Sequence, residues 1–297
     1  MKNPKIILMV SIFALVGCKQ AKSVNSENVS TSKKEITLTK LWETDTLLKT
    51  CESVRYDVDK KSIYVSNIGG VPPSKKDGDG SISIINLDGK IINQNWTTGI
   101  DAPKGIDFFN EKLYVADIDA IVRIDKKTGV IEKKYPVSDA IFLNDVAIDS
   151  NGDVYVTDSK NDKIYKLVDD AVSVWMALEG MNPNGVLVED SRILVVSLSK
   201  GDFISIDKKT KEQTILATGI VGGDGIVSIK EGYIISAWQG EIYFVEKNAK
   251  SEGAIKILDT KDQKLNTADI GIIPEKNILL VPTFFGNKVV AYKIDYK

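Results

Sequence analysis

The sequence predicts an all-β protein: a single six-bladed β-propeller over residues 36–297, closed by an N-terminal strand in the last blade. Three observations predict this fold. Short β-rich segments recur with a period of about 40 residues, the length of a four-stranded blade. Gly, Asn and Asp separate these segments at turns. No part of the predicted domain keeps a helical periodicity of apolar residues over more than three turns.

The second repeat shows how a blade is recognised in the sequence. Residues 104–108 form an inner strand, and residues 113–117 supply a second strand with the sequence Leu-Tyr-Val-Ala-Asp. A third strand is expected at 121–124, and a Lys-Thr-Gly turn leads to a fourth at 130–135. The other repeats open in the same way, with one polar residue before an apolar strand. The six opening residues are Glu52, Lys104, Asn144, Asn184, Asp224 and Asp269.

Two repeats differ from this pattern. The last repeat, residues 269–295, has room for only three strands, so we expect residues 36–42 to supply its fourth. This pairing would close the ring and protect the edges that an open array exposes. The first repeat is lengthened by residues 68–80, which are rich in Gly, Pro and Asp. We expect this insertion to be a loop that can fold over one mouth of the ring.

The N-terminal residues predict export and lipidation. Residues 1–17 resemble a lipoprotein signal peptide, with an apolar run at 6–16 that is too short to span a bilayer. The run ends in Leu-Val-Gly-Cys, similar to the lipobox of bacterial lipoproteins, in which Cys18 is lipidated. An ordinary signal peptide with a chance cysteine is the alternative. Residues 18–35 are polar and predict a flexible tether.

We therefore expect a monomeric protein of the cell envelope, facing the periplasm or the exterior and touching a membrane only through its lipid anchor. Cys51 is the one cysteine of the predicted domain and cannot form an internal disulfide. It is expected to be a small buried apolar residue.

Composition excludes several classes of function. The chain has no histidine, which removes imidazole bases, imidazole metal ligands and Ser-His or Cys-His nucleophile pairs. Its 39 basic and 41 acidic residues are nearly balanced. A nucleic-acid-binding protein needs a strong basic excess, so we expect no nucleic-acid partner.

The six opening residues predict a polar site on the propeller axis. Each enters the innermost strand of its blade, so the six side chains are expected to converge. A ring of oxygen donors suits a hard cation, so Ca²⁺ or Mg²⁺ fits better than Zn²⁺, which stays an alternative. The competing interpretation is that the Asn-Gly and Asp-Gly pairs in these segments only form turns.

The order of these residues resembles the senescence marker protein/gluconolactonase family of six-bladed propellers, over essentially the whole predicted domain. In that family a divalent cation, typically calcium, lies on the axis. The resemblance implies four metal ligands at matching repeat positions: Glu52, Asn144 in Leu-Asn-Asp-Val, Asn184 in Pro-Asn-Gly and Asp224 in Gly-Asp-Gly. The chain departs from the family after Glu52, where Ser-Val-Arg replaces the usual Gly-Pro and aromatic residue. It also adds Lys104 to the ring.

The leading functional hypothesis is metal-dependent hydrolysis of a lactone or similar ester, with a small lactone or sugar derivative as substrate. The cation would polarise the carbonyl, and Asp224 or Glu52 would activate a water molecule. Lys104 and Asp269 are candidate substrate-binding residues, with an ion pair between them as the alternative.

Two other functions stay open. A non-catalytic binding propeller would hold a structural axial ion beneath loops that recognise a sugar, a peptide or an envelope partner. A scaffold or redox propeller is the third class, and no cofactor motif supports its redox form.

Overall fold

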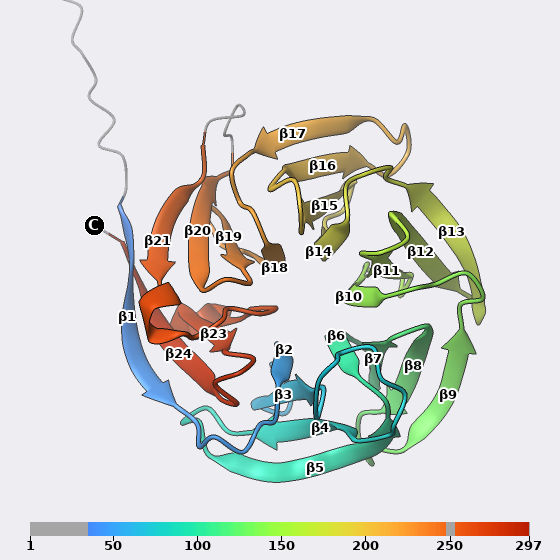
Figure 1. Ribbon diagram of the computed structural model, residues 1–297, viewed down its shortest axis with the longest axis horizontal. Helices are drawn as coiled ribbons and strands as arrows, with labels where there is room; N and C mark the ends of the chain where they lie inside the picture. The colour runs from blue at the N-terminus through green and yellow to red at the C-terminus, as the bar shows by residue number, and fades with distance from the viewer. Residues whose placement is uncertain (1–34, 248–252, 297) are drawn as a thin grey trace, which may run out of the picture. The chain divides into compact units, whose positions relative to one another are not determined.

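The computed structural model describes residues 35–247 and 253–296, and these residues form the predicted six-bladed β-propeller (Figure 1). Six four-stranded sheets surround a central axis. The predicted signal peptide (1–17), Cys18 and all but the last residue of the predicted tether (18–35) lie outside the described residues. In the described part of the chain, no helix has the length and apolar character needed to cross a membrane.

The strands of each blade follow one another outward from the axis, antiparallel and in chain order for the first five blades (Figure 1). Blade 1 consists of β2 (Cys51–Asp57), β3 (Ser62–Asn67), β4 (Gly80–Ile85) and β5 (Ile91–Ile100). Blade 2 consists of β6 (Pro103–Phe109), β7 (Lys112–Asp117), β8 (Ala120–Asp125) and β9 (Ile131–Pro136). Blade 3 consists of β10 (Leu143–Ile148), β11 (Val154–Asp158), β12 (Lys163–Val168) and β13 (Ala171–Ala177). Blades 4 and 5 consist of β14 (Pro183–Val188), β15 (Arg192–Ser197), β16 (Phe203–Asp207) and β17 (Gln213–Ala217); and β18 (Gly223–Ser228), β19 (Gly232–Ala237), β20 (Glu241–Glu246) and β21 (Ile255–Asp259). Blade 6 consists of β22 (Gly271–Ile273), β23 (Ile278–Pro282), β24 (Val289–Tyr296) and β1 (Ile36–Glu43), with the 3₁₀ helices η1 (Lys261–Gln263) and η2 (Pro274–Lys276) on either side of β22.

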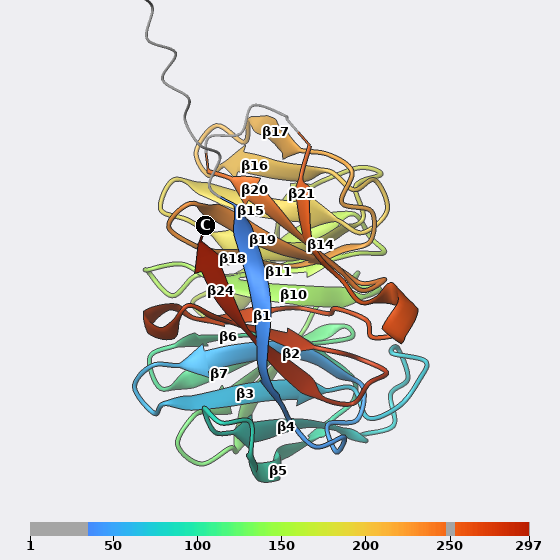
Figure 2. The same cartoon turned by 90° about the vertical axis from the view of Figure 1, so that its left-hand side faces the viewer.

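The first strand of the domain completes the last blade. β1 pairs antiparallel with β24, from Ile36 opposite Tyr296 to Glu43 opposite Val290. Figure 2 shows β1 in blue beside β24 in dark red. The prediction that residues 36–42 close the ring is confirmed, and β24 is not left as an unpaired edge.

Adjacent blades pack through apolar side chains that alternate along their strands. Between blades 1 and 2, Tyr64 is buried in edge-to-face contact with Trp96 and Phe108, with ring centroids 5.0 and 5.1 Å apart. Similar clusters join the other neighbouring blades. Cys51 is completely buried between blades 6 and 1, as predicted, and this burial raises the pKa of its thiol to about 12.

A β-bulge interrupts the pairing of the two innermost strands at the same place in each of the first five blades. In blade 4, the register shifts between Pro183 and Val186, so that Asn184 and Gly185 leave the regular ladder. Equivalent shifts occur at the starts of β2, β6, β10 and β18. A bulge of this kind bends a strand and redirects its side chains, and here it affects the opening polar residue of each repeat.

The Asn-Gly and Asp-Gly pairs of blades 4 and 5 therefore belong to strands rather than to turns. A Cβ atom at Gly185 would lie 1.6 Å from the Asp224 carbonyl oxygen in the next blade. A Cβ atom at Gly225 would lie 2.4 Å from Asp269 Oδ1. Glycine is required at both positions because the backbones of adjacent blades approach closely around the axis.

Removal of β1 tests the closure of the ring. A chain that begins at Asp45 loses the buried side chain of Ile36 and the partly buried Leu38 and Trp42. We expect its free energy of unfolding to be at least about 3 kcal/mol lower than that of a chain beginning at Glu35. The exposed edge of β24 should also promote association. Denaturant unfolding and size-exclusion chromatography measure both effects, and equal stability would show that three strands suffice for blade 6.

Candidate functional site

A cavity of about 390 Å³ lies at the centre of the ring. Its floor contains the opening residues of five repeats, which the sequence placed on the axis: Glu52, Lys104, Asn144, Asn184 and Asp224. Each of these side chains is buried, and at most 6% of any of the five residues is exposed. The sixth opening residue, Asp269, is buried but does not line the cavity.

Two oxygen atoms of the floor have no hydrogen-bond partner. Asn184 donates from Nδ2 to Asp224 Oδ1 at 3.2 Å, and Asn144 donates from Nδ2 to Ser159 Oγ at 3.0 Å. In the described part of the chain, Glu52 Oε2 and Asn184 Oδ1 are buried and accept no hydrogen bond. Leaving a buried oxygen unpaired is costly, so these two atoms mark a position suited to a cation or a hydrogen-bond donor.

The floor carries more negative charge than its surroundings neutralise. Burial raises the pKa of Glu52 well above its ordinary value, and the carboxylates of Asp224 and Asp269 raise it further. Burial also raises the pKa of Asp224, with additional increases from the charges of Asp269 and Asp145. The floor therefore favours the uptake of protons or of a cation.

Lys104 supplies a positive charge at the floor. Its ammonium group donates to the Ala102 carbonyl at 3.0 Å and lies 4.4 Å from the centroid of the Phe142 ring. Burial lowers the pKa of Lys104 to about 8, and the negative charge of Glu52 partly opposes this shift. Among the described residues no ion pair joins Lys104 to Asp269, the alternative that we considered, and the Asp269 carboxylate contacts Arg55.

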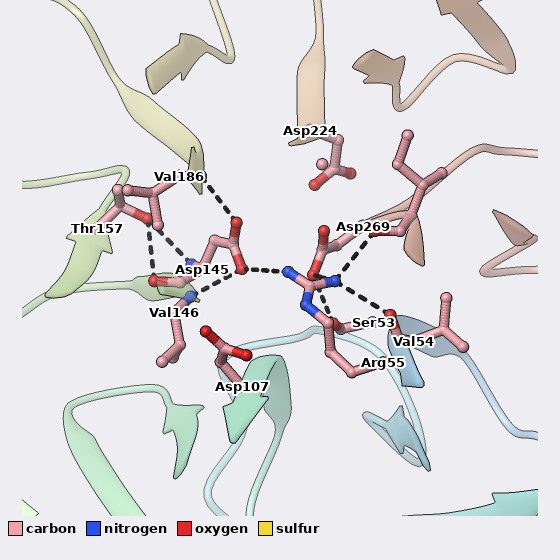
Figure 3. Close-up of polar contacts among 12 residues, drawn as sticks. Ser53, Val54, Arg55, Asp107, Asp145, Val146, Thr157, Val186, Asp224 and Asp269 are labelled. Carbon is pink, nitrogen blue, oxygen red and sulfur yellow. Dashed lines mark hydrogen bonds and ion pairs between the residues drawn. The ribbon is translucent and has the colours of Figure 1, made fainter. Parts of the chain in front are cut away.

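A second layer of charged side chains surrounds Arg55 near the axis (Figure 3). The Arg55 guanidinium lies 3.0 Å from Asp269 Oδ2 and 3.5 Å from Asp145 Oδ1. Ser53 Oγ also donates to Asp269 Oδ2. Burial raises the pKa of the nearby Asp107 to about 6, although the charge of Arg55 lowers it. Asp269, predicted to bind substrate, therefore faces Arg55 and Ser53 rather than the cavity.

Two of these carboxylates also connect neighbouring blades. Asp145 in blade 3 accepts from the Val186 N–H of blade 4 at 2.8 Å, and Asp107 in blade 2 accepts from the Ile148 N–H of blade 3 at 2.9 Å. Arg55, Asp107 and Asp145 are absent from the expected site residues. Two of them could have been identified from the repeat. Arg55 and Asp107 are charged residues that occupy the same repeat position, three residues after the opening residue of their blade.

Apolar side chains form the wall above the floor, here called the apolar collar. Its members are Ile68, Phe142, Leu198, Trp238, Phe284 and Phe285. The Phe284 and Phe285 rings meet edge to face with centroids 4.8 Å apart, and both contact Trp238. Ile68, Leu198 and Trp238 each follow directly after the second strand of a blade. This shared repeat position is a sequence signal for these three members of the collar, whereas Phe142, Phe284 and Phe285 lie elsewhere in their repeats.

Two apolar residues of the buried cluster beside the cavity adopt an unfavourable backbone conformation. Phe284 has a φ of 41°, and Ile118, which belongs to the same buried cluster, has a φ of 56°. Left-handed backbone is unfavourable for bulky and β-branched residues, at a cost of roughly 1–3 kcal/mol each. The surrounding structure therefore stabilises a strained arrangement that keeps the Phe284 ring at the cavity.

The insertion at residues 68–80 also reaches the cavity. Val71 and Pro73 line it together with Ile68 of the collar, as expected for a loop folded over one mouth of the ring. Gly78 N–H donates to Asp101 Oδ1 at 3.0 Å, which connects the far end of the loop to the start of blade 2. The loop therefore forms part of the cavity wall.

The oxygen donors of the floor fit a hard divalent cation. Glu52 and Asp224 supply carboxylate oxygens, and Asn144 and Asn184 supply amide oxygens, which are ligand types that Ca²⁺ and Mg²⁺ prefer. The unpartnered Glu52 Oε2 and Asn184 Oδ1 belong to this set. Over residues 35–247 and 253–296, no three His, Cys, Asp or Glu side chains gather as a metal-binding group. The donor set of the floor therefore combines two carboxylates with two asparagine amides.

Replacement of Arg55 by Met tests the second layer of charges. We expect the free energy of unfolding to fall by about 3–5 kcal/mol, because buried carboxylates lose their counter-charge. A carboxyl group whose pKa is higher in the folded state than in the unfolded state binds its proton more tightly when folded. Asp107 has a folded pKa of about 6 against an ordinary 3.8, so the loss should shrink as the pH falls below neutrality. Denaturant unfolding across this pH range measures it.

Arg123→Met is the matched control for this substitution. Arg123 forms partly exposed ion pairs with Glu132 and Asp170 away from the axis. Such pairs contribute at most about 1 kcal/mol, so the control should change stability little at any pH. Equal losses in the two variants would contradict the compensating role of Arg55.

The comparison with solved structures supports the fold. No family model and no curated protein matches the chain. Among solved structures, a virginiamycin B lyase from Staphylococcus aureus bound to quinupristin is similar, with a TM-score of 0.60, 14% identity and coverage of 88% of this chain and 99% of that one. A streptogramin B lyase has a TM-score of 0.60 and 12% identity over 88% of this chain and 98% of that one. The first is an inactive variant with a histidine replaced by alanine, whereas the present chain contains no histidine. These neighbours establish the propeller fold.

Proposed function

We propose that this protein is a propeller enzyme that hydrolyses a lactone or similar ester at the floor of the axial cavity. The observation that carries this proposal is the pair of buried, unpartnered oxygens Glu52 Oε2 and Asn184 Oδ1 in the cavity that Lys104 also lines. One cavity thus contains a candidate base in Glu52, hydrogen-bond acceptors in the unpartnered oxygens, and a candidate proton donor in Lys104. The names of the structural neighbours, which are lyases, agree with catalysis on this fold but do not assign a reaction to this chain.

Glu52, Asn144, Asn184 and Asp224 are the residues proposed to hold a divalent cation, with Ca²⁺ favoured and Mg²⁺ or Zn²⁺ as alternatives. When bound, such an ion acts as a Lewis acid that polarises the ester carbonyl. The cation also offsets the mutual repulsion of the Glu52 and Asp224 carboxylates, whose pKa values are raised in the structure.

The side chains of the floor can carry the proton transfers of ester hydrolysis. Glu52 accepts a proton from the attacking water, with Asp224 as the alternative base. The water oxygen bonds to the carbonyl carbon, and the bond from that carbon to the ester oxygen breaks. Lys104, with a pKa of about 8, is protonated at neutral pH and donates a proton to the departing alkoxide. Its position beside Phe142 keeps this proton donor away from bulk water.

A non-catalytic binding propeller is the second candidate. The apolar collar favours it, because a wall of six large apolar side chains supplies binding energy without any chemistry. The expected partner in that case is a sugar, a peptide or an envelope component, and the axial ion is structural. Substrate turnover separates the two candidates.

We also propose that the protein lies in the cell envelope, anchored through lipid on Cys18 and facing the periplasm or the exterior. The support is the lipobox-like sequence that ends at Cys18. The pairing of β1 with β24 closes the ring within a single chain, which is consistent with the monomer that we expect.

Cation binding is tested by thermal unfolding of the metal-stripped protein during titration with Ca²⁺, Mg²⁺ and Zn²⁺. A cation that binds only the folded state stabilises it by about 2.7 kcal/mol at a concentration 100 times its Kd. We expect Asp224→Asn to abolish this shift because it removes one carboxylate ligand. The control Asp190→Asn changes an exposed acid in the β14–β15 connection and should keep the shift. An absence of any shift in the unaltered protein would overturn the cation site.

Hydrolysis is tested with a panel of lactones and esters at neutral pH. We expect Glu52→Gln to lower kcat by about 100-fold or more, because an amide cannot accept the proton of water. Lys104→Met should lower kcat similarly by removing the proton donor. Circular dichroism checks that both variants stay folded. A folded, cation-loaded protein that turns over no member of the panel would favour the binding propeller.

A further inference from the structure

The apolar collar exposes large apolar side chains around a single opening. Phe285 is 52% exposed, Leu198 is 37% exposed, and Val71 of the adjoining insertion is 58% exposed. They come from blades 6, 4 and 1, yet all three line the same cavity. Apolar surface gathered in this way around a hollow is typical of a ligand site.

The inner part of this apolar surface is separate from the core between the blades. Ile68, Ala102, Ile118, Ala268 and Phe284 form their own buried cluster, against which Trp238 packs. Two members, Ile118 and Phe284, keep left-handed backbone conformations to take part. Strain of this kind concentrates at functional sites, which indicates that the cluster supports the collar for a purpose other than blade packing.

Polar groups of the lining are confined to the floor. Of the thirteen residues that line the cavity, the polar or charged ones are the five opening residues of the repeats, and the other eight are apolar. A ligand with hydroxyl groups all around it would press several of them against the collar without hydrogen-bond partners, at a large cost. The lining instead matches a ligand that is polar at one end only.

We propose that the site takes an amphiphilic ester or lactone, whose carbonyl end contacts the polar floor and whose alkyl or aromatic group packs against the apolar collar. The ester at the polar end rests on the proposed hydrolase function. The apolar group of the ligand is inferred from the collar alone and does not depend on the proposed function. On this proposal simple sugar lactones bind poorly, and lipophilic esters or lactones are the preferred ligands.

The test compares γ-valerolactone, γ-octalactone and γ-decalactone, which share one lactone ring and differ only in the length of the alkyl chain. Glucono-δ-lactone serves as the polar comparison. Binding is followed through tryptophan fluorescence, since Trp238 is the only one of the four tryptophans that lines the cavity. Calorimetric titration confirms the affinities, and hydrolysis is measured separately on the same compounds.

We expect affinity to increase about three- to fourfold for each added methylene group that reaches the collar. Glucono-δ-lactone should bind more weakly than γ-octalactone. Phe285→Ser should reduce the gain per methylene, and the fold should tolerate it because Phe285 is half exposed. The matched control Ile92→Ser removes an exposed apolar side chain from the outer strand β5 and should leave the gain unchanged.

The outcomes separate this inference from the proposed function. Affinity that is independent of chain length, or tighter binding of glucono-δ-lactone, overturns the amphiphilic ligand even if hydrolysis occurs. A clear dependence on chain length without turnover of any compound supports the apolar site and overturns the hydrolase. An equal loss of affinity in Phe285→Ser and Ile92→Ser would show that the collar is not the surface that binds the chain.

Discussion

The centre of this propeller depends on the ion pairs of the Arg55 guanidinium. Asp145 and Asp269 are buried within ion-pair distance of it, and its charge also lowers the pKa of Asp107. Asp145 and Asp107 in turn accept backbone N–H groups from the next blade. A buried carboxylate without a counter-charge is strongly destabilising. The positive charge of Arg55 in blade 1 therefore allows acidic side chains from three other blades to lie near the axis, where two of them connect neighbouring blades.

That compensation reaches the cavity floor only in part, because the charge of Arg55 lowers the pKa of Glu52 but does not offset the effect of its burial. Glu52 and Asp224 keep raised pKa values, and Lys104 keeps a lowered one, because all three are buried. Perturbed groups of opposite kinds in one cavity are typical of functional sites. The buried charges of the floor and the strained backbone at Phe284 lower the stability of the fold. The apolar packing between the blades offsets this loss.

The same repeat produces both parts of the site. In the first five blades a bulge at the start of the inner strand places a polar residue at the floor, and in blades 1, 4 and 5 the residue after the second strand is an apolar member of the collar. Small changes at these two positions can alter the ligand while the ring stays intact.

The sequence by itself determined the six blades, the closing strand and the identity of the floor residues. These features follow from periodicity, since strands of one repeat must occupy equivalent positions. It did not reveal that Asp269 belongs to Arg55 rather than to the cavity, or that Trp238 and Phe284 form its wall. Such pairings join residues far apart in the chain, and they depend on bulges, on the close approach of backbones at Gly185 and on burial, which only the assembled ring creates.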